Sequence, residues 1–331
     1  MAENLEVKEL EQVVVRFSGD SGDGMQLAGN IFSTVSATIG NGISTFPDYP
    51  ADIRAPQGSL TGVSGFQVHI GEGKVYTPGD KCDVLVAMNA AALKTQYKHA
   101  KPQATIIIDT DSFGPKDLEK AEFKTADYLA EMGIDEDRVV ACPISKMVKD
   151  CLADSGMDNK AIMKCRNMFA LGIVCWLFNR DVTLVENFLR EKFAKKPQIA
   201  ENNIKVVNAG FNYGHNTHAG VPATYRIESK NKVKGRYMDI TGNKATAYGL
   251  IAAAEKAGMK LFLGSYPITP ATDVLHELAK HKSLGVTTVQ CEDEISGCAS
   301  AVGASFAGAM AATSTSGPGV CLKSEAINLA V

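Results

Sequence analysis

The sequence predicts an α/β fold with two domains, because segments with strand character alternate with amphipathic helices along most of its 331 residues. Residues 13–17 form a largely apolar run that is typical of a buried strand, and the glycine-rich residues 19–24 lead from it into a predicted helix over 25–39. We therefore expect a mixed or parallel sheet in the N-terminal domain, with further strands at 66–70, 84–88 and 105–109.

The N-terminal domain is predicted to end in two helices, over 159–178 and 182–193. The first has a mostly apolar surface, which indicates that it is covered on several sides. From residue 200 onward the sequence becomes polar, as is typical of a connection between domains. We therefore predict a first domain at 1–199, a linker at 200–235 and a second domain at 236–331.

The second domain has a strand-then-helix order that occurs three times. Residues 259–263 are mostly apolar and residues 287–291 are rich in β-branched side chains, so both are predicted strands. The complete prediction is strands at 259–263, 287–291 and 311–316, with helices at 270–282, 293–308 and 320–331. This alternation predicts a doubly wound parallel sheet, and the many Gly, Ala and Ser residues of 293–308 allow that helix to pack very closely.

Four short motifs lie at the ends of these elements. They are Gly-Asn at 242–243, Tyr-Pro-Ile-Thr-Pro at 266–270, Glu-Asp-Glu at 292–294 and Ser-Gly-Pro-Gly at 316–319. The last three follow predicted strands, and ligands of open parallel sheets bind at the carboxyl ends of the strands. The sequence therefore predicts a binding site at this edge of the sheet.

The motif at 266–270, together with a glutamate at a helix start, resembles the pyrimidine-binding domain of the thiamine diphosphate-dependent 2-oxoacid:ferredoxin oxidoreductases. The chain has Ala271 where the family motif continues with serine. Residues 19–25 and 50–58 resemble the gamma domain of the same family. A gamma domain fused ahead of the alpha domain is similar to the alpha subunits of two-subunit 2-oxoglutarate and broad-specificity 2-oxoacid enzymes.

The resemblance implies a subunit that oxidatively decarboxylates a 2-oxoacid, with 2-oxoglutarate favoured, and uses coenzyme A to form an acyl-CoA, CO2 and reduced ferredoxin. Thiamine diphosphate would be shared with a beta subunit, which would also carry Mg2+ and a 4Fe-4S cluster. The chain alone would be inactive. The alternatives are the same reaction on pyruvate or branched-chain 2-oxoacids, and a non-catalytic or truncated subunit that only binds a partner.

The family motifs also imply roles for individual residues. Glu294, the third of the three acids, would be the catalytic carboxylate that hydrogen-bonds N1′ of the cofactor's aminopyrimidine. Thr269 would contact the cofactor and the substrate. The other residues expected to bind the cofactor are Tyr266, Gly317 and Gly319.

The residues alone allow simpler interpretations. Acids at 292–294 also complement the positive end of a helix, each contributing about 0.3 to 1 kcal/mol. Thr269 is equally suited to be the N-cap of the following helix, with Pro270 at its first position. Asn243 is interpreted mainly as an N-cap, and residues 316–319 could form only a tight turn.

Composition excludes several other classes. The formal net charge of −3 gives no electrostatic footprint for nucleic acid. The longest apolar run, 168–178, is about half of the roughly 20 residues that a membrane-spanning helix needs, and the acidic N-terminus does not resemble a signal peptide, so a cytoplasmic protein is expected. The order of glycines at 19–24 is not that of a dinucleotide-binding loop.

The chain contains eight cysteines without a Cys-x-x-Cys pair and six histidines without metal-ligand spacing, so buried free thiols and no metal site are expected. Arg54 is interpreted as half of a structural ion pair, with an anion such as a coenzyme A phosphate as the alternative. The second domain stops inside a predicted helix, where members of the family continue, and a truncated domain is therefore expected. A naturally short subunit that is completed by another polypeptide is the alternative.

Overall fold

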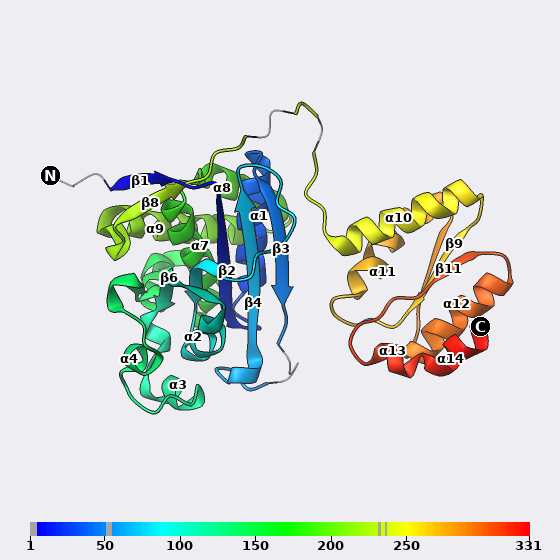
Figure 1. Ribbon diagram of the computed structural model, residues 1–331, viewed down its shortest axis with the longest axis horizontal. Coiled ribbons are helices and arrows are strands. Elements are labelled where there is room, and N and C mark those ends of the chain that lie inside the picture. The colour runs from blue at the N-terminus through cyan, green and yellow to red at the C-terminus, as the bar shows by residue number, and fades with distance from the viewer. Residues whose placement is uncertain (1–4, 51–54, 231–232, 236) are drawn as a thin grey trace. The chain divides into compact units, whose positions relative to one another are not determined.

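A computed structural model describes residues 5–50, 55–230, 233–235 and 237–331. The chain forms two compact units, Met1–Lys234 and Gly235–Val331, and each is considered by itself (Figure 1). Arg54 lies outside the described residues. In the described part of the chain, no helix combines the length and the apolar character that crossing a membrane requires.

The first unit is built on a six-stranded mixed sheet with the order β3-β4-β2-β5-β6-β7. Strand β2 pairs antiparallel with β4 and parallel with β5, which agrees with the predicted mixed or parallel sheet. Two further strands, β1 and β8, pair in parallel as a separate small sheet. The strands are β1 Glu6–Glu9, β2 Gln12–Asp20, β3 Gly42–Asp48, β4 Val63–Gly71, β5 Cys82–Ala87, β6 Ala100–Asp109, β7 Val139–Cys142 and β8 Ala223–Arg226.

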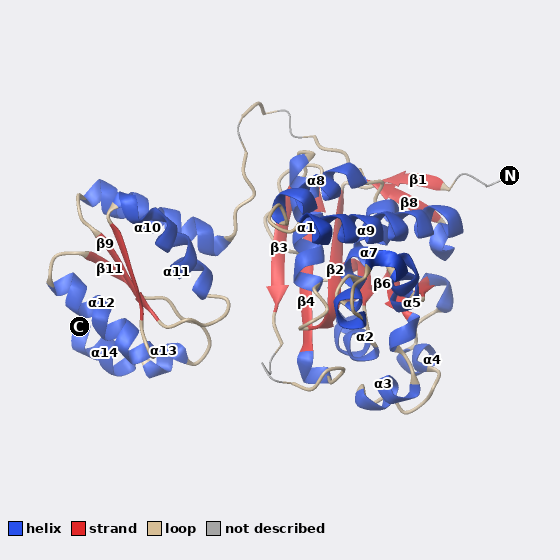
Figure 2. Cartoon of the chain, turned by 180° about the vertical axis from the view of Figure 1, so that it is seen from behind, coloured by secondary structure: helices blue, strands red, loops and turns tan. Residues whose placement is uncertain are grey.

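Helices cover both faces of the large sheet (Figure 2). Side chains alternate across β2, so Val13, Val15 and Phe17 join one apolar core with α1, α7, α8 and α9. Val14 points to the opposite face and joins a second core with α2 and α3. The helices are α1 Met25–Thr38, α2 Ala90–Gln96, α3 Pro115–Lys120, α4 Tyr128–Met132, α5 Ile144–Cys151, α6 Asn159–Met163, α7 Arg166–Leu177, α8 Val182–Lys192 and α9 Pro197–Thr217.

The single helix expected at 159–178 is two helices, α6 and α7. After its first residue, α7 is buried along its whole length, so the prediction that this apolar segment is covered on several sides is confirmed. Asp158 caps the start of α6, and the segment breaks at Lys164 and Cys165, between the end of α6 and the start of α7.

The linker predicted at 200–235 is wrong over its first part, because α9 packs along α7 and β8 pairs with β1. The two helices approach closely at glycines. A Cβ on Gly172 would lie 2.2 Å from the carbonyl oxygen of Val207, and one on Gly210 would lie 2.1 Å from that of Phe169. The polar character of α9 does not prevent burial, since Asn203, for example, donates to the carbonyl of Ile199.

The second unit has a three-stranded parallel sheet with the order β10-β9-β11. Helices α10 and α11 pack on one face through an apolar cluster that includes Leu261, Leu263 and Leu278, and α12 packs against β9 and β11. The predicted doubly wound parallel arrangement is confirmed (Figure 1). The elements are α10 Gly242–Ala257, β9 Leu261–Ser265, α11 Thr272–Leu278, β10 Val286–Gln290, α12 Glu294–Phe306, β11 Met310–Ala312, α13 Gly319–Leu322 and α14 Ser324–Ala330.

Candidate functional site

The loops that follow β9 and β11 are tied together at the carboxyl edge of the second sheet. Ser265, the last residue of β9, donates from Oγ to the carbonyl oxygen of Ser314 at 2.9 Å. Further along, Ser316 Oγ donates to the carbonyl oxygen of Thr269 at 2.9 Å. The third strand therefore ends earlier than the predicted 311–316, because residues after Ala312 serve these loop contacts instead of the sheet.

The helix after the loop at 266–270 begins two residues later than the predicted start at 270. Helix α11 begins at Thr272, whose amide donates to the carbonyl of Ile268, and its N-cap residue Ala271 makes no side-chain cap. The N-cap interpretation of Thr269 is therefore wrong. Thr269 precedes a cis peptide bond to Pro270 and its side chain is exposed, as is Tyr266, so both are available to a ligand.

The Gly-Asn motif also differs from the expectation. Thr241 is the N-cap of α10, and its hydroxyl accepts from the amide of Lys244. Asn243 lies inside the first turn, where its Nδ2 donates to the carbonyl oxygen of Pro270 at 2.9 Å. Asn243 therefore holds the loop at 266–270 in place of capping a helix.

The three acids at the start of α12 have different positions. Asp293 is the N-cap, and its Oδ1 accepts from the amide of Ser296 at 2.7 Å. Glu292 is exposed, whereas Glu294 is half-buried in the first turn. Asp293 therefore caps the helix, a role that sequence analysis did not assign to it, and among the described residues no hydrogen bond occupies the Glu294 carboxylate.

Close packing brings Glu294 to the edge of the sheet. A Cβ on Gly264 of β9 would lie 2.6 Å from the carbonyl oxygen of Gly297, so only glycine at position 264 allows α12 to approach this closely. Close packing of this helix was predicted from the Gly, Ala and Ser residues of 293–308. On the other side, Gly319 lies against Glu294: a Cβ on Gly319 would be 3.2 Å from Glu294 Cγ. Gly317, in the same loop, is exposed and has a φ of 55°, a left-handed conformation that favours glycine.

Lys323 is part of this edge and was missed by sequence analysis. Its side chain is buried, with 2% of the residue exposed, and Nζ donates to Thr313 Oγ1 at 2.7 Å and to the Ser314 carbonyl oxygen at 3.1 Å. Burial lowers the pKa of Lys323, while Cys298 and Glu294 act in the opposite direction. The available signal was a lysine directly after the apolar residues 320–322.

A polar cluster lies at the carboxyl ends of β2 and β6 in the first unit. Arg166 bonds through Nη2 to Asp23 Oδ1 at 2.6 Å and through Nη1 to Asp109 Oδ2 at 3.5 Å, and Ser145 Oγ donates to the same Asp109 oxygen at 2.6 Å. Burial raises the pKa of Asp23, an effect that Arg166 opposes. The cluster fixes the glycine-rich loop at 19–24 to α7, and its ionic groups pair with one another.

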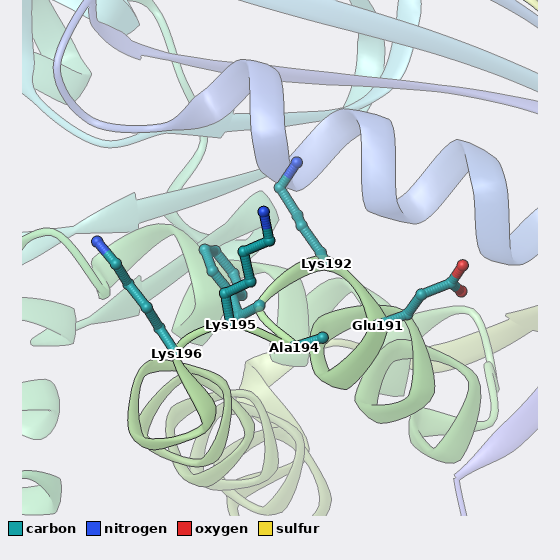
Figure 3. Close-up of a pocket in the computed structure, with 6 residues that line it drawn as sticks. Glu191, Lys192, Ala194, Lys195 and Lys196 are labelled. Atoms are coloured by element: carbon teal, nitrogen blue, oxygen red, sulfur yellow. The ribbon is translucent and has the colours of Figure 1, made fainter.

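Other features of the described residues do not add a second site. A shallow hollow in the first unit is lined by six consecutive residues, 191–196, and Figure 3 shows Lys192, Lys195 and Lys196 extending separately from this turn. No group of three His, Cys, Asp or Glu side chains that could hold a metal ion is found in the described ranges. All eight cysteines are free and five of them are buried, as predicted for most of these thiols.

The second unit is therefore a doubly wound α/β domain with three loops at the carboxyl edge of its sheet. Residues 252–331 match the family described as pyruvate flavodoxin/ferredoxin oxidoreductase, thiamine diphosphate-binding, and residues 14–213 match pyruvate ferredoxin/flavodoxin oxidoreductase. The chain belongs to this family of 2-oxoacid:ferredoxin oxidoreductases, which confirms the predicted relationship.

Relatives with known names support the same assignment. The chain is 46% identical to the 2-oxoglutarate oxidoreductase subunit KorA of Mycobacterium tuberculosis, over 98% of this chain and 49% of the relative. It is 23% identical to 2-oxoacid:ferredoxin oxidoreductase 2, subunit alpha, of Aeropyrum pernix, over 95% and 52% of the two chains. The chain thus spans about half the length of the curated relatives it matches.

A solved structure resembles the whole chain. The 2-oxoglutarate:ferredoxin oxidoreductase from Magnetococcus marinus, with 2-oxoglutarate, coenzyme A and succinyl-CoA bound, is 28% identical and has a TM-score of 0.69. The similarity covers 95% of this chain and 49% of that chain. Both units described above therefore occur together in a protein of known structure.

Proposed function

We propose that this chain is the gamma-alpha part of a 2-oxoacid:ferredoxin oxidoreductase that acts together with a beta subunit. The reaction is the oxidative decarboxylation of a 2-oxoacid with coenzyme A to acyl-CoA, CO2 and reduced ferredoxin. The observation that carries the proposal is the position of Glu294, half-buried and without a hydrogen-bond partner in the described chain, at the edge of a domain that matches a thiamine diphosphate-binding family.

The side chains at this edge fit the aminopyrimidine part of thiamine diphosphate. When bound, thiamine diphosphate supplies the carbon nucleophile and the electron sink for decarboxylation. Glu294 would hold a proton between its carboxylate and N1′ of the pyrimidine. Tyr266 and Thr269 are exposed in the loop after β9, and the backbone at Gly317 and Gly319, in the loop after β11, would approach the cofactor. Thr269 would also contact the 2-oxoacid.

The remaining machinery is assigned to partners. The spacing of the cysteines in this chain is unlike that of the known iron–sulfur motifs, so we place the 4Fe-4S cluster, and with it Mg2+, on the beta subunit. Ferredoxin would accept the electrons from that cluster. Free thiols persist in reducing compartments, and we accordingly place the enzyme in the cytoplasm.

We favour 2-oxoglutarate as the substrate because the KorA relative and the Magnetococcus structure both bear that acid in their names. The test is to co-express the full-length protein with its beta subunit and to measure coenzyme A-dependent reduction of a viologen dye. The proposal expects strong reduction with 2-oxoglutarate. Greater reduction with pyruvate or branched-chain 2-oxoacids would change the substrate. No reduction with any acid, in a stable complex that contains thiamine diphosphate and cluster, would favour a non-catalytic partner-binding subunit.

A further inference from the structure

Lys323 is the one charged side chain among the buried residues in the described part of the second unit. It lies between α13 and α14, where its amide donates to the carbonyls of Gly319 and Val320 and its carbonyl accepts from the amide of Ile327. The position is therefore fixed from both sides. A buried ammonium is unfavourable unless it is hydrogen-bonded and faces compensating charge, which raises the question of what this charge does.

The hydrogen bonds of Lys323 fix the beginning of the loop that contacts Glu294. Nζ binds Thr313 Oγ1 and the Ser314 carbonyl, directly after β11. The same loop then reaches the Thr269 carbonyl through Ser316, and its last residue, Gly319, packs against Glu294 Cγ. Because Lys323 is also hydrogen-bonded to Gly319 through its own backbone, it holds both ends of the loop.

Burial lowers the pKa of Lys323, and Cys298, Glu294 and Cys291 oppose that effect. Of these, Glu294 is the carboxylate, and Cys298 is buried. Methionine, which is apolar and of similar length, could fill the space but could not donate to the loop.

We propose that Lys323 is a positioning residue for the thiamine reaction: its ammonium fixes residues 313–319 against Glu294 and thereby holds the Glu294 carboxylate in the orientation that contacts the pyrimidine. This inference rests on the proposed function, since it assigns a role at the same site. It adds a residue that touches neither cofactor nor substrate and acts through Glu294.

The test uses the full-length enzyme with its beta subunit, saturated with thiamine diphosphate and Mg2+ in the absence of any 2-oxoacid. The readout is the rate at which deuterium replaces the C2 proton of the bound cofactor, measured by acid quench and proton NMR. Lys323→Met is expected to slow this exchange about 10- to 100-fold while the enzyme still contains stoichiometric cofactor. Lys323→Arg, which keeps the charge and the donors, is expected to recover most of the rate.

Two further variants make the result unambiguous. Lys282→Met removes an exposed lysine of the same unit and is expected to leave the exchange rate unchanged. Thr313→Val removes the 2.7 Å hydrogen bond alone, and it decides the matter if Lys323→Met does not assemble: slower exchange supports the inference and an unchanged rate overturns it.

The outcomes also separate this inference from the proposed function. If the wild-type enzyme accelerates the exchange and Lys323→Met accelerates it equally, only the inference about Lys323 is overturned. Equal loss in Lys323→Met and Lys323→Arg also overturns it, because charge and donors would then be irrelevant. A wild-type complex that binds thiamine diphosphate without accelerating the exchange overturns the proposed function, and the role of Lys323 with it.

Discussion

Glu294 Cγ lies 3.2 Å from the point at which a Cβ on Gly319 would stand, so the start of α12 and the loop after β11 are in direct contact. The same Cβ would be only 2.0 Å from Thr315 Oγ1. Since neither side chain has free space on that side, any group larger than hydrogen at Gly319 must displace the loop or the carboxylate.

Gly319→Ala is therefore expected to lower turnover of the assembled enzyme about 10- to 100-fold, because a displaced carboxylate no longer meets the pyrimidine in the reactive geometry. Steady-state viologen reduction measures this. Gly303→Ala is the matched control: it lies in α12 as well, but a Cβ there meets nothing within 4 Å. Equal activity of both variants would show that the contact is not needed.

Gly210 makes a second backbone contact that the sequence did not reveal. Gly210→Ala is expected to reduce the free energy of unfolding by about 1–3 kcal/mol, since its Cβ would collide with the Phe169 carbonyl in α7. Gly249→Ala, in the exposed middle of α10, is expected to stabilise the chain by about 0.5–1 kcal/mol. Urea unfolding followed by circular dichroism compares the two. A neutral or stabilising Gly210→Ala would contradict the packing of α9 on α7.

The strength of the local sequence pattern decides which elements could be predicted from the sequence. The alternating strands and helices of the second unit have strong local patterns, so their order and the parallel sheet were predicted correctly. Helix α9 has a weaker pattern, because its buried face contains Gly210, Gly214 and polar residues such as Asn203. It is stabilised by tertiary packing on α7 that a local pattern does not contain.

The candidate site shows the same division. The motif at 266–270 and Glu294 are adjacent to recognisable helix starts and were identified by resemblance. The cap residues were misassigned for two reasons. Thr241 and Asn243 are both favourable N-cap residues, two positions apart, and Ala271 is an unfavourable one that makes no side-chain cap. The pairing of Arg166 with Asp23 joins segments 143 residues apart, and no local signal predicts it. The lysine after the apolar residues 320–322 is a local signal, but it does not show that the Lys323 side chain is buried.

Arg166 is expected to be important for the stability of the first unit. Arg166→Met leaves the buried Asp23 and Asp109 without their cation, and the expected cost is about 3–5 kcal/mol of unfolding free energy. Arg190→Met provides the control, since that arginine forms exposed ion pairs with Glu186 and Glu201, whose loss is not expected to be measurable. Urea titrations at pH 7 distinguish them, and equal stability of both variants would contradict the role of the cluster.

Asp20 makes stability depend on pH. Burial, and then the charge of Asp23, raise its pKa above the ordinary value of 3.8 in the folded protein. At pH values between the pKa of Asp20 in the unfolded state and its higher pKa in the folded state, the folded state binds the proton more strongly. The contribution of Asp20 to stability therefore falls as pH rises through this range. Asp20→Asn cannot titrate.

The unfolding free energy of Asp20→Asn, relative to wild type, is therefore expected to increase as pH rises from 4 to 7. Urea midpoints at several pH values measure this difference. A difference for Asp20→Asn that stays constant with pH would mean that burial does not favour its protonated form.

The central claim is that Glu294 of this chain supplies the carboxylate for thiamine chemistry. The most direct measurement is coenzyme A-dependent viologen reduction by the full-length enzyme with its beta subunit, comparing Glu294→Gln with Glu292→Gln. The account predicts intact assembly for both, turnover lowered about 100-fold or more in Glu294→Gln through loss of the proton-sharing carboxylate, and near wild-type turnover in Glu292→Gln. Near wild-type turnover in Glu294→Gln would contradict the claim.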